Sequence, residues 1–160
     1  MTISVRENFG GLQPDNADVL NETEIRILTA LGFMAARSGQ LVPCLRIFEA
    51  LSLLRPTKAF PYIGLTVGYL AVGMASAAVE LLRDKAVLFC KNDPDIHLYL
   101  ALAFYQSGRP ASAIRLLDSW ADFSSTDPEN NPLYRRLYEL IENSPRSDSP
   151  PVPASVIGLD

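Results

Sequence analysis

Three glycines recur through the middle of the chain at almost equal intervals, and this spacing constrains the fold more than any other feature. Gly39, Gly73 and Gly108 lie 34 and 35 residues apart. A period of about 20–50 residues is typical of repeat proteins, in which each unit buries its apolar face only by packing on its neighbours. The spacing therefore predicts a short stack of similar units, provided that the residues around each glycine also recur.

The residues around each glycine do recur in kind. A leucine lies eight positions before it, another apolar residue four before, a small residue five after and a large apolar residue nine after. These sets are Leu31, Leu65 and Leu100; Ala35, Tyr69 and Phe104; Cys44, Ala78 and Ala113; and Phe48, Leu82 and Leu117. Glycine readily ends a helix in a left-handed conformation that other residues resist. The pattern therefore predicts a helix end at each glycine, followed by a repeated set of packed apolar and small residues.

This pattern resembles the tetratricopeptide repeat, a unit of about 34 residues made of two helices. The resemblance covers residues 25 to about 128, with repeats at about 25–58, 59–92 and 94–128. Ala35 and Cys44 depart from the usual aromatic residue and alanine, and Pro94 and Pro128 come later than the usual proline. The resemblance implies an all-α fold, a helical hairpin solenoid of three tetratricopeptide repeats plus a C-terminal capping helix.

The chain is predicted to have one folded domain between two tails. We expect residues 1–18 to form a disordered leader, residues 19–143 the repeat domain with its cap at 130–143, and residues 144–160 a disordered Pro-rich tail. The expected helices cover about 20–38, 41–54, 58–72, 75–91, 95–107, 110–123 and 130–143.

An uncharged stretch of 18 residues, Tyr62–Val79, raises the alternative of a membrane span, and its Gly64 and Gly68 form a small-xxx-small pair. Only six of these residues are Ile, Leu or Val, and Gly73 lies inside the stretch as a turn. The repeat explains the segment better, so we expect no stable membrane insertion.

Charge and composition exclude several functions. The net charge is −4, with 14 basic and 18 acidic residues, which argues against binding nucleic acid through a basic surface. One histidine and two cysteines are too few for a usual metal site, and we find no phosphate-binding loop or catalytic motif. We therefore expect no metal, no cofactor and no enzymatic activity. The N-terminal residues do not resemble a secretory signal, which favours a cytoplasmic location.

The candidate site is the surface formed by the first helices of the repeats, which line a concave groove in tetratricopeptide stacks. The resemblance places mainly apolar residues there: Phe33, Phe60, Ile63, Val67, Leu70, Leu98, Leu102 and Tyr105. Such a groove would bind an apolar peptide or an amphipathic helix. The alternative is that a capping helix or a dimer partner fills it. Arg26 and Arg37 are the basic residues at the groove positions, too few for a clamp on acidic peptides.

The length, the repeats and several short sequences resemble the chaperones of bacterial type III secretion. The class that holds translocator proteins is similar in Arg37–Gly39, in the Phe-Glu-Ala-Leu sequence at 48–51 and in Pro61–Leu65. Chaperones of needle subunits share the repeat, and Leu53–Pro56 is similar to a plant-pathogen secretion family. The choice among these three classes stays open.

The resemblance implies a cytosolic chaperone that binds an apolar segment or helix of an exported translocator or needle subunit. It would keep that partner soluble before export. A co-chaperone and a homodimer remain open as further partners. The alternative function is a protein-interaction scaffold, or an assembly or regulatory factor of a bacterial machine, because its groove would have the same chemistry.

Overall fold

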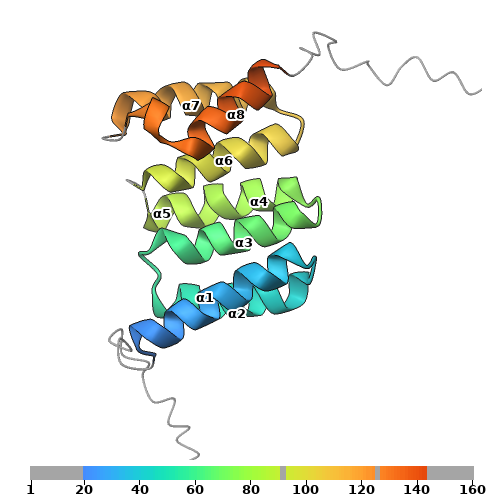
Figure 1. Cartoon of the computed structure of the whole chain (residues 1–160), viewed down its shortest axis with the longest axis vertical. Coiled ribbons are helices and arrows are strands. Elements are labelled where there is room, and N and C mark those ends of the chain that lie inside the picture. Colours follow the sequence, from blue (N-terminus) through green and yellow to red (C-terminus); the bar gives the residue numbers. More distant parts are fainter. Residues whose placement is uncertain (1–19, 91–92, 125–126, 144–160) are drawn as a thin grey trace, which may run out of the picture.

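The computed structural model describes residues 20–90, 93–124 and 127–143 and arranges them as a row of helical hairpins (Figure 1). The helices are α1 (Glu22–Arg37), α2 (Leu41–Leu54), α3 (Ala59–Ala71), α4 (Ala75–Leu81), α5 (Val87–Phe89), α6 (Pro94–Gln106), α7 (Pro110–Phe123) and α8 (Pro132–Glu142). A π-helical turn, η2 (Leu82–Ala86), joins α4 to α5, and a 3-10 turn, η3 (Pro128–Asn130), precedes α8. The all-α fold is confirmed. The expected leader and tail lie outside the described residues.

The hairpins form two layers. The first helices α1, α3 and α6 lie side by side in the nearer layer of Figure 1, and the second helices α2, α4 and α7 lie behind them. Helix α8 continues the layer of first helices beyond α6 and packs on both α6 and α7. The fold is therefore the expected solenoid, closed at one end by a capping helix.

The three repeated glycines end the first helix of each hairpin in the same way. Their φ angles are +67° at Gly39, +78° at Gly73 and +77° at Gly108, a region that side chains with a Cβ rarely adopt. The residue after each glycine donates its backbone N–H to a carbonyl oxygen five positions earlier, at the turn of the hairpin. These bonds, each 2.9 Å, join Gln40 to Ala35, Met74 to Tyr69 and Arg109 to Phe104. The period in the sequence is thus a repeated helix-ending turn.

The small residues lie where helices cross closely. Cys44, Ala78 and Ala113 are completely buried. The Phe48 ring fills the space between α1 and α3, because a Cβ added at Gly32 or Gly64 would lie 2.6 or 2.3 Å from it. The glycines of the uncharged stretch thus let α3 approach α2. Of the helices in the described part of the chain, none is long and apolar enough to cross a membrane.

The second hairpin contains one extra residue in its second helix. In the first and third hairpins, the next buried residue after the large apolar position follows three residues later: Leu51 follows Phe48, and Trp120 follows Leu117. The same spacing in the second hairpin would bury the charged residue Lys85.

The π-helical turn η2 avoids this burial. Within η2, Lys85 is exposed, and Ala86, four residues after Leu82, takes the buried place. The Val87 N–H donates to the Leu82 carbonyl oxygen, five residues back, which is the hydrogen bond of a π-helix. The extra residue also explains why the second glycine spacing is 35 rather than 34.

We expect deletion of Lys85 to be tolerated, because it removes the extra residue and lets Ala86 follow Leu82 at the spacing of the other hairpins. The melting temperature should change by only a few degrees, which corresponds to about 1 kcal/mol in a domain of this size. The matched control is deletion of the exposed Arg115 from the regular helix α7. This deletion should lower the free energy of unfolding by more than about 4 kcal/mol, because it rotates Leu117 and Trp120 away from their buried positions. Equal losses in thermal unfolding of the two variants would contradict this account of η2.

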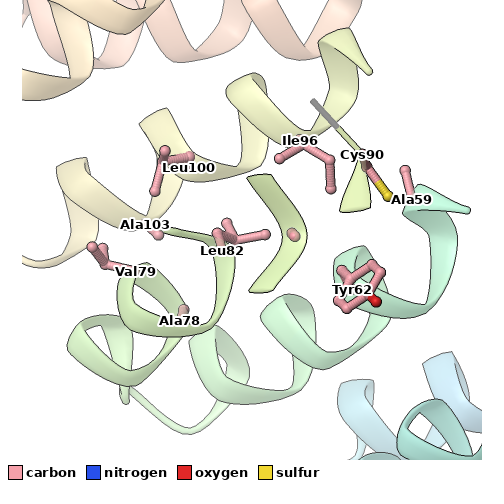
Figure 2. Close-up of a cluster of buried hydrophobic side chains, with 10 residues drawn as sticks. Ala59, Tyr62, Ala78, Val79, Leu82, Cys90, Ile96, Leu100 and Ala103 are labelled. Carbon is pink, nitrogen blue, oxygen red and sulfur yellow. The ribbon is translucent and has the colours of Figure 1, made fainter. Parts of the chain in front are cut away.

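The core between the second and third hairpins is continuous. Figure 2 shows Tyr62 of α3, Leu82 of η2 and Ile96 of α6 among the buried side chains of this cluster. The Tyr62 hydroxyl donates to the Pro56 carbonyl oxygen at 3.0 Å, which satisfies its polar end in the core. This packing fixes α3 against α6, so side chains on the outer sides of these two helices hold a set relative position.

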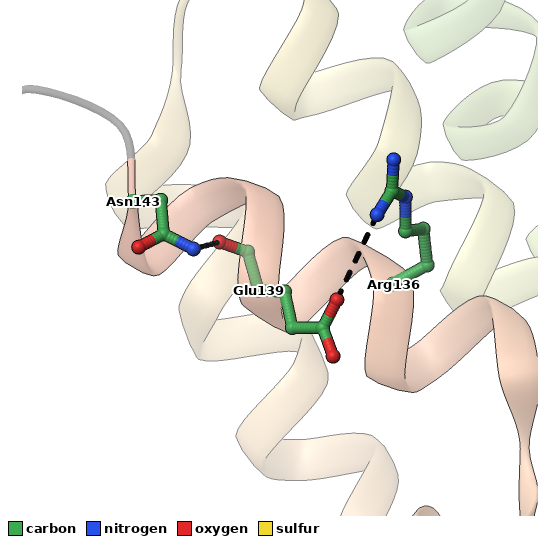
Figure 3. Close-up of polar contacts among 3 residues, drawn as sticks. All are labelled: Arg136, Glu139 and Asn143. Atoms are coloured by element: carbon green, nitrogen blue, oxygen red, sulfur yellow. Dashed lines mark hydrogen bonds and ion pairs between the residues drawn. The ribbon is translucent and has the colours of Figure 1, made fainter.

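Helix α8 closes the solenoid with an apolar inner side, and its solvent-facing side carries charged groups beside the exposed Tyr138 and Leu140. Leu137 and Ile141 are buried in the same cluster as Trp120 of α7. On the outer side, Arg136 and Glu139 form an ion pair at 3.8 Å, and the Asn143 side-chain amide donates to the Glu139 carbonyl oxygen at 2.8 Å (Figure 3). Both charged side chains are well exposed, so the pair adds little stability, but it keeps this end of the stack hydrated.

Candidate protein-binding face

Seven of the eight residues expected in the groove are half-exposed on the layer of first helices. They are Phe33 on α1, Phe60, Ile63, Val67 and Leu70 on α3, and Leu102 and Tyr105 on α6. We call these seven residues the first-helix face. Each also packs against one of the three buried clusters, so its position is fixed while part of its apolar surface stays in water.

Helix α3 supplies the centre of the first-helix face. Its four members are spaced three, four and three residues apart, which places them along one side of a helix. Helix α3 carries no charged residue. A partner that lies across α3 would therefore meet a continuous apolar stripe without having to desolvate a charge.

Leu98 does not belong to this face, which corrects the sequence-based expectation. It is 1% exposed and packs with Leu117, Trp120, Leu137 and Ile141. The reason is the capping helix: α8 packs on α6 and buries the position that would otherwise continue the stripe. One part of the expected groove is thus filled by the cap, as the alternative interpretation of the sequence allowed.

Along the first helices α1, α3 and α6, charged residues lie on α1 and at the start of α6. On α1, Arg26 and Arg37 are exposed, and the Phe33 ring between them packs edge-on against Phe48 at a centroid distance of 5.0 Å. At the start of α6, partial desolvation and then the Asp93 carboxylate raise the pKa of the Asp95 carboxyl group. The face is therefore apolar at its centre, with Arg26 and Arg37 at its α1 end and Asp95 where α6 begins.

The two thiols have the environment of structural cysteines. Burial raises the pKa of the Cys44 thiol, and burial followed by the Asp93 charge raises the pKa of the Cys90 thiol. A raised pKa lowers the fraction of thiolate, which is the nucleophilic form. The Cys44 thiol also donates to the Gly64 carbonyl oxygen at 3.8 Å. Among the described residues, no group of three His, Cys, Asp or Glu could hold a metal ion.

A second apolar surface, on the outer side of α1, was missed by the sequence analysis. Ile27, Leu31 and Met34 are 54%, 47% and 63% exposed and lie on one side of the helix. Their spacing of four and three residues was visible in the sequence, but it is equally typical of a helix that faces a core. The sequence cannot say that no neighbouring unit covers this side.

No protein-family model and no curated protein matches this sequence. Solved structures do match. The chain resembles PcrH from Pseudomonas aeruginosa at 24% identity, over 77% of this chain and 92% of that chain, with a TM-score of 0.62. It resembles the type III secretion translocator chaperone SycD of Yersinia enterocolitica at 22% identity, over 78% and 93%, with a TM-score of 0.63.

A thermophilic tetratricopeptide-repeat protein of Thermus thermophilus is similar at 21% identity, over 76% of this chain and 67% of that chain, with a TM-score of 0.60. The chain thus has a tetratricopeptide-repeat fold. More narrowly, it has the fold of the solved type III translocator chaperones. PcrH has been solved in complex with the chaperone binding regions of PopD and of PopB, and SycD with a peptide of the translocator YopD.

Proposed function

We propose that this protein is a type III secretion chaperone that binds an apolar segment or helix of an exported protein on the first-helix face. A translocator or a needle subunit is the partner that fits best. The observation that carries the proposal is the face itself, an uncharged and half-exposed apolar surface on three adjacent helices of a translocator-chaperone fold. Complexes of similar chaperones with translocator segments support it.

The physical basis of this function is burial rather than chemistry. Apolar surface taken out of water contributes roughly 25 cal/mol per Å², so a partner segment that covers several half-exposed side chains gains affinity without any charged contact. The same segment, left free, would expose its own apolar residues and aggregate. Binding in the cytoplasm would keep it soluble until export, and no metal, nucleotide or reaction is needed.

Co-purification from the native host tests this proposal. The tagged full-length chain is captured, and the bound proteins are identified by mass spectrometry. The expected partner is an exported protein with a long apolar segment, enriched at least tenfold over capture with a Leu102→Glu variant. An Ala50→Glu variant is the matched control, because it adds the same charge on the exposed side of α2. Capture of a static component of the secretion machine instead would favour the scaffold function.

A further inference from the structure

The Pro-rich tail contains a stretch whose composition does not suit a tail that stays in water. Residues 149–159 carry no charge, and they include Val152, Val156, Ile157 and Leu159 together with three prolines. Chains that remain solvated usually combine low hydrophobicity with high charge. Four aliphatic side chains within eight residues supply enough apolar surface to dock on another apolar face.

Helix α8, which the tail follows in the sequence, continues the row of first helices beyond α6 (Figure 1). Adjacent packed helices lie about 8–10 Å apart, so α3 lies roughly 20 Å from α8. The nine residue-to-residue steps from Asn143 to Val152 can span about 28 Å at about 3.1 Å per step. The chain is therefore long enough for the aliphatic stretch to reach both α6 and α3.

We propose that residues 150–159 dock on the α3 and α6 part of the first-helix face of the same chain, and that a partner must displace them. This proposal uses the same face as the proposed function and, in its competition with a partner, rests on that function. The chemistry of the two surfaces matches. The docked stretch and α3 are both uncharged, and Asp148 and Asp160 flank the stretch, so no charge is buried.

The aromatic rings of the face add to this match. Phe60 lies at the start of α3 and Tyr105 near the end of α6, and both are half-exposed. Aromatic-lined surfaces commonly bind extended proline-containing peptides, because such peptides lose little conformational freedom on binding.

The tether makes even weak docking effective. A short linker holds a tethered segment at an effective concentration in the millimolar range. If the free segment binds with a dissociation constant of about 0.1 mM, the docked state of the tethered segment is about ten times as populated as the undocked state. The apparent affinity of any competitor then falls by about the same factor, because only the open fraction binds.

The test uses the full-length chain and a fluorescein-labelled peptide of residues 149–160. Peptide binding is followed by fluorescence polarisation with the wild type and with a Val156→Glu/Ile157→Glu variant, whose own tail should not dock. We expect the variant to bind the peptide about tenfold more tightly than the wild type. A Ser144→Glu/Ser147→Glu variant, with the same added charge nearer α8, should bind like the wild type.

Equal binding by the wild type and the Val156→Glu/Ile157→Glu variant would overturn the proposal, and so would the absence of binding to either. Adding Leu102→Glu to the tail variant should abolish its gain in affinity, and a gain that persists would place the docking site elsewhere. Failure here is distinguishable from failure of the proposed function. If the wild type captures an exported partner but the tail variant binds the peptide no more tightly, only the docking proposal fails. If the tail variant binds the peptide more tightly but no exported partner is captured, only the chaperone proposal fails.

Discussion

Replacing Val67 or Leu102 by glutamate should weaken partner binding about 100-fold while the chain stays folded. Both residues are half-exposed, and they lie on adjacent helices of the first-helix face. Burying a large apolar side chain contributes roughly 1.5–3 kcal/mol, and every 1.4 kcal/mol is a factor of ten in affinity. A carboxylate does further harm, because a partner's apolar side chain would have to strip its water.

The measurement is a titration of the co-purified partner, with circular dichroism to confirm folding. Ala50→Glu on α2 should bind like the wild type. Leu98→Glu provides a second contrast, because this residue lies in the core and its variant should unfold rather than lose binding alone. Normal binding by folded Val67→Glu and Leu102→Glu variants would show that the partner uses another surface.

Phe48→Ala should reduce the free energy of unfolding by about 3–5 kcal/mol, which is near the upper end for truncation of one core side chain. Phe48 is completely buried, and its ring fills the space that Gly32 and Gly64 leave between α1 and α3. Gly32 and Gly64 have no side chains that could move in to close the cavity. Such a loss is a large part of the 5–15 kcal/mol that stabilises a typical domain.

Urea denaturation measures this loss, with Leu53→Ala as the control. Leu53 lies on the same helix but is 83% exposed, so its substitution should change stability by less than about 0.5 kcal/mol. Gly64→Ala tests the same contact from the other side, since its Cβ would overlap the Phe48 ring. Combining Gly64→Ala with Phe48→Leu should cost less than the sum of the two single changes, and simple additivity would contradict the contact.

Much of the fold could be predicted because its signals are local. A glycine at the end of an amphipathic segment predicts a left-handed turn at that residue, and the three repeated turns then predict where the helices begin and end. The small residues Ala78 and Ala113 likewise report close helix crossings. The π-helical turn was not predicted, although the 35-residue spacing and the charge of Lys85 were both visible. Its location depends on which residue the neighbouring helices bury, and that is a tertiary effect.

The candidate site was predicted less completely for the same reason. The sequence indicates which side of α3 is apolar, but the burial of Leu98 depends on where the capping helix α8 packs. The exposure of Ile27, Leu31 and Met34 depends on whether anything covers α1, and the sequence pattern is identical in both cases.

The contrast between the two ends of the stack gives it a direction of growth. The solvent-facing side of α8 carries an ion pair beside two exposed apolar residues, Tyr138 and Leu140, whereas the outer side of α1 presents a row of three more exposed aliphatic side chains. In stacks of this kind each unit adds mainly one interface term with its neighbour. A designed hairpin fused ahead of Glu22 could pack on the exposed aliphatic side chains of α1, whereas one fused after Asn143 would have to pack against charged groups of α8. The molecule should therefore be extended as a modular scaffold more readily from the α1 side.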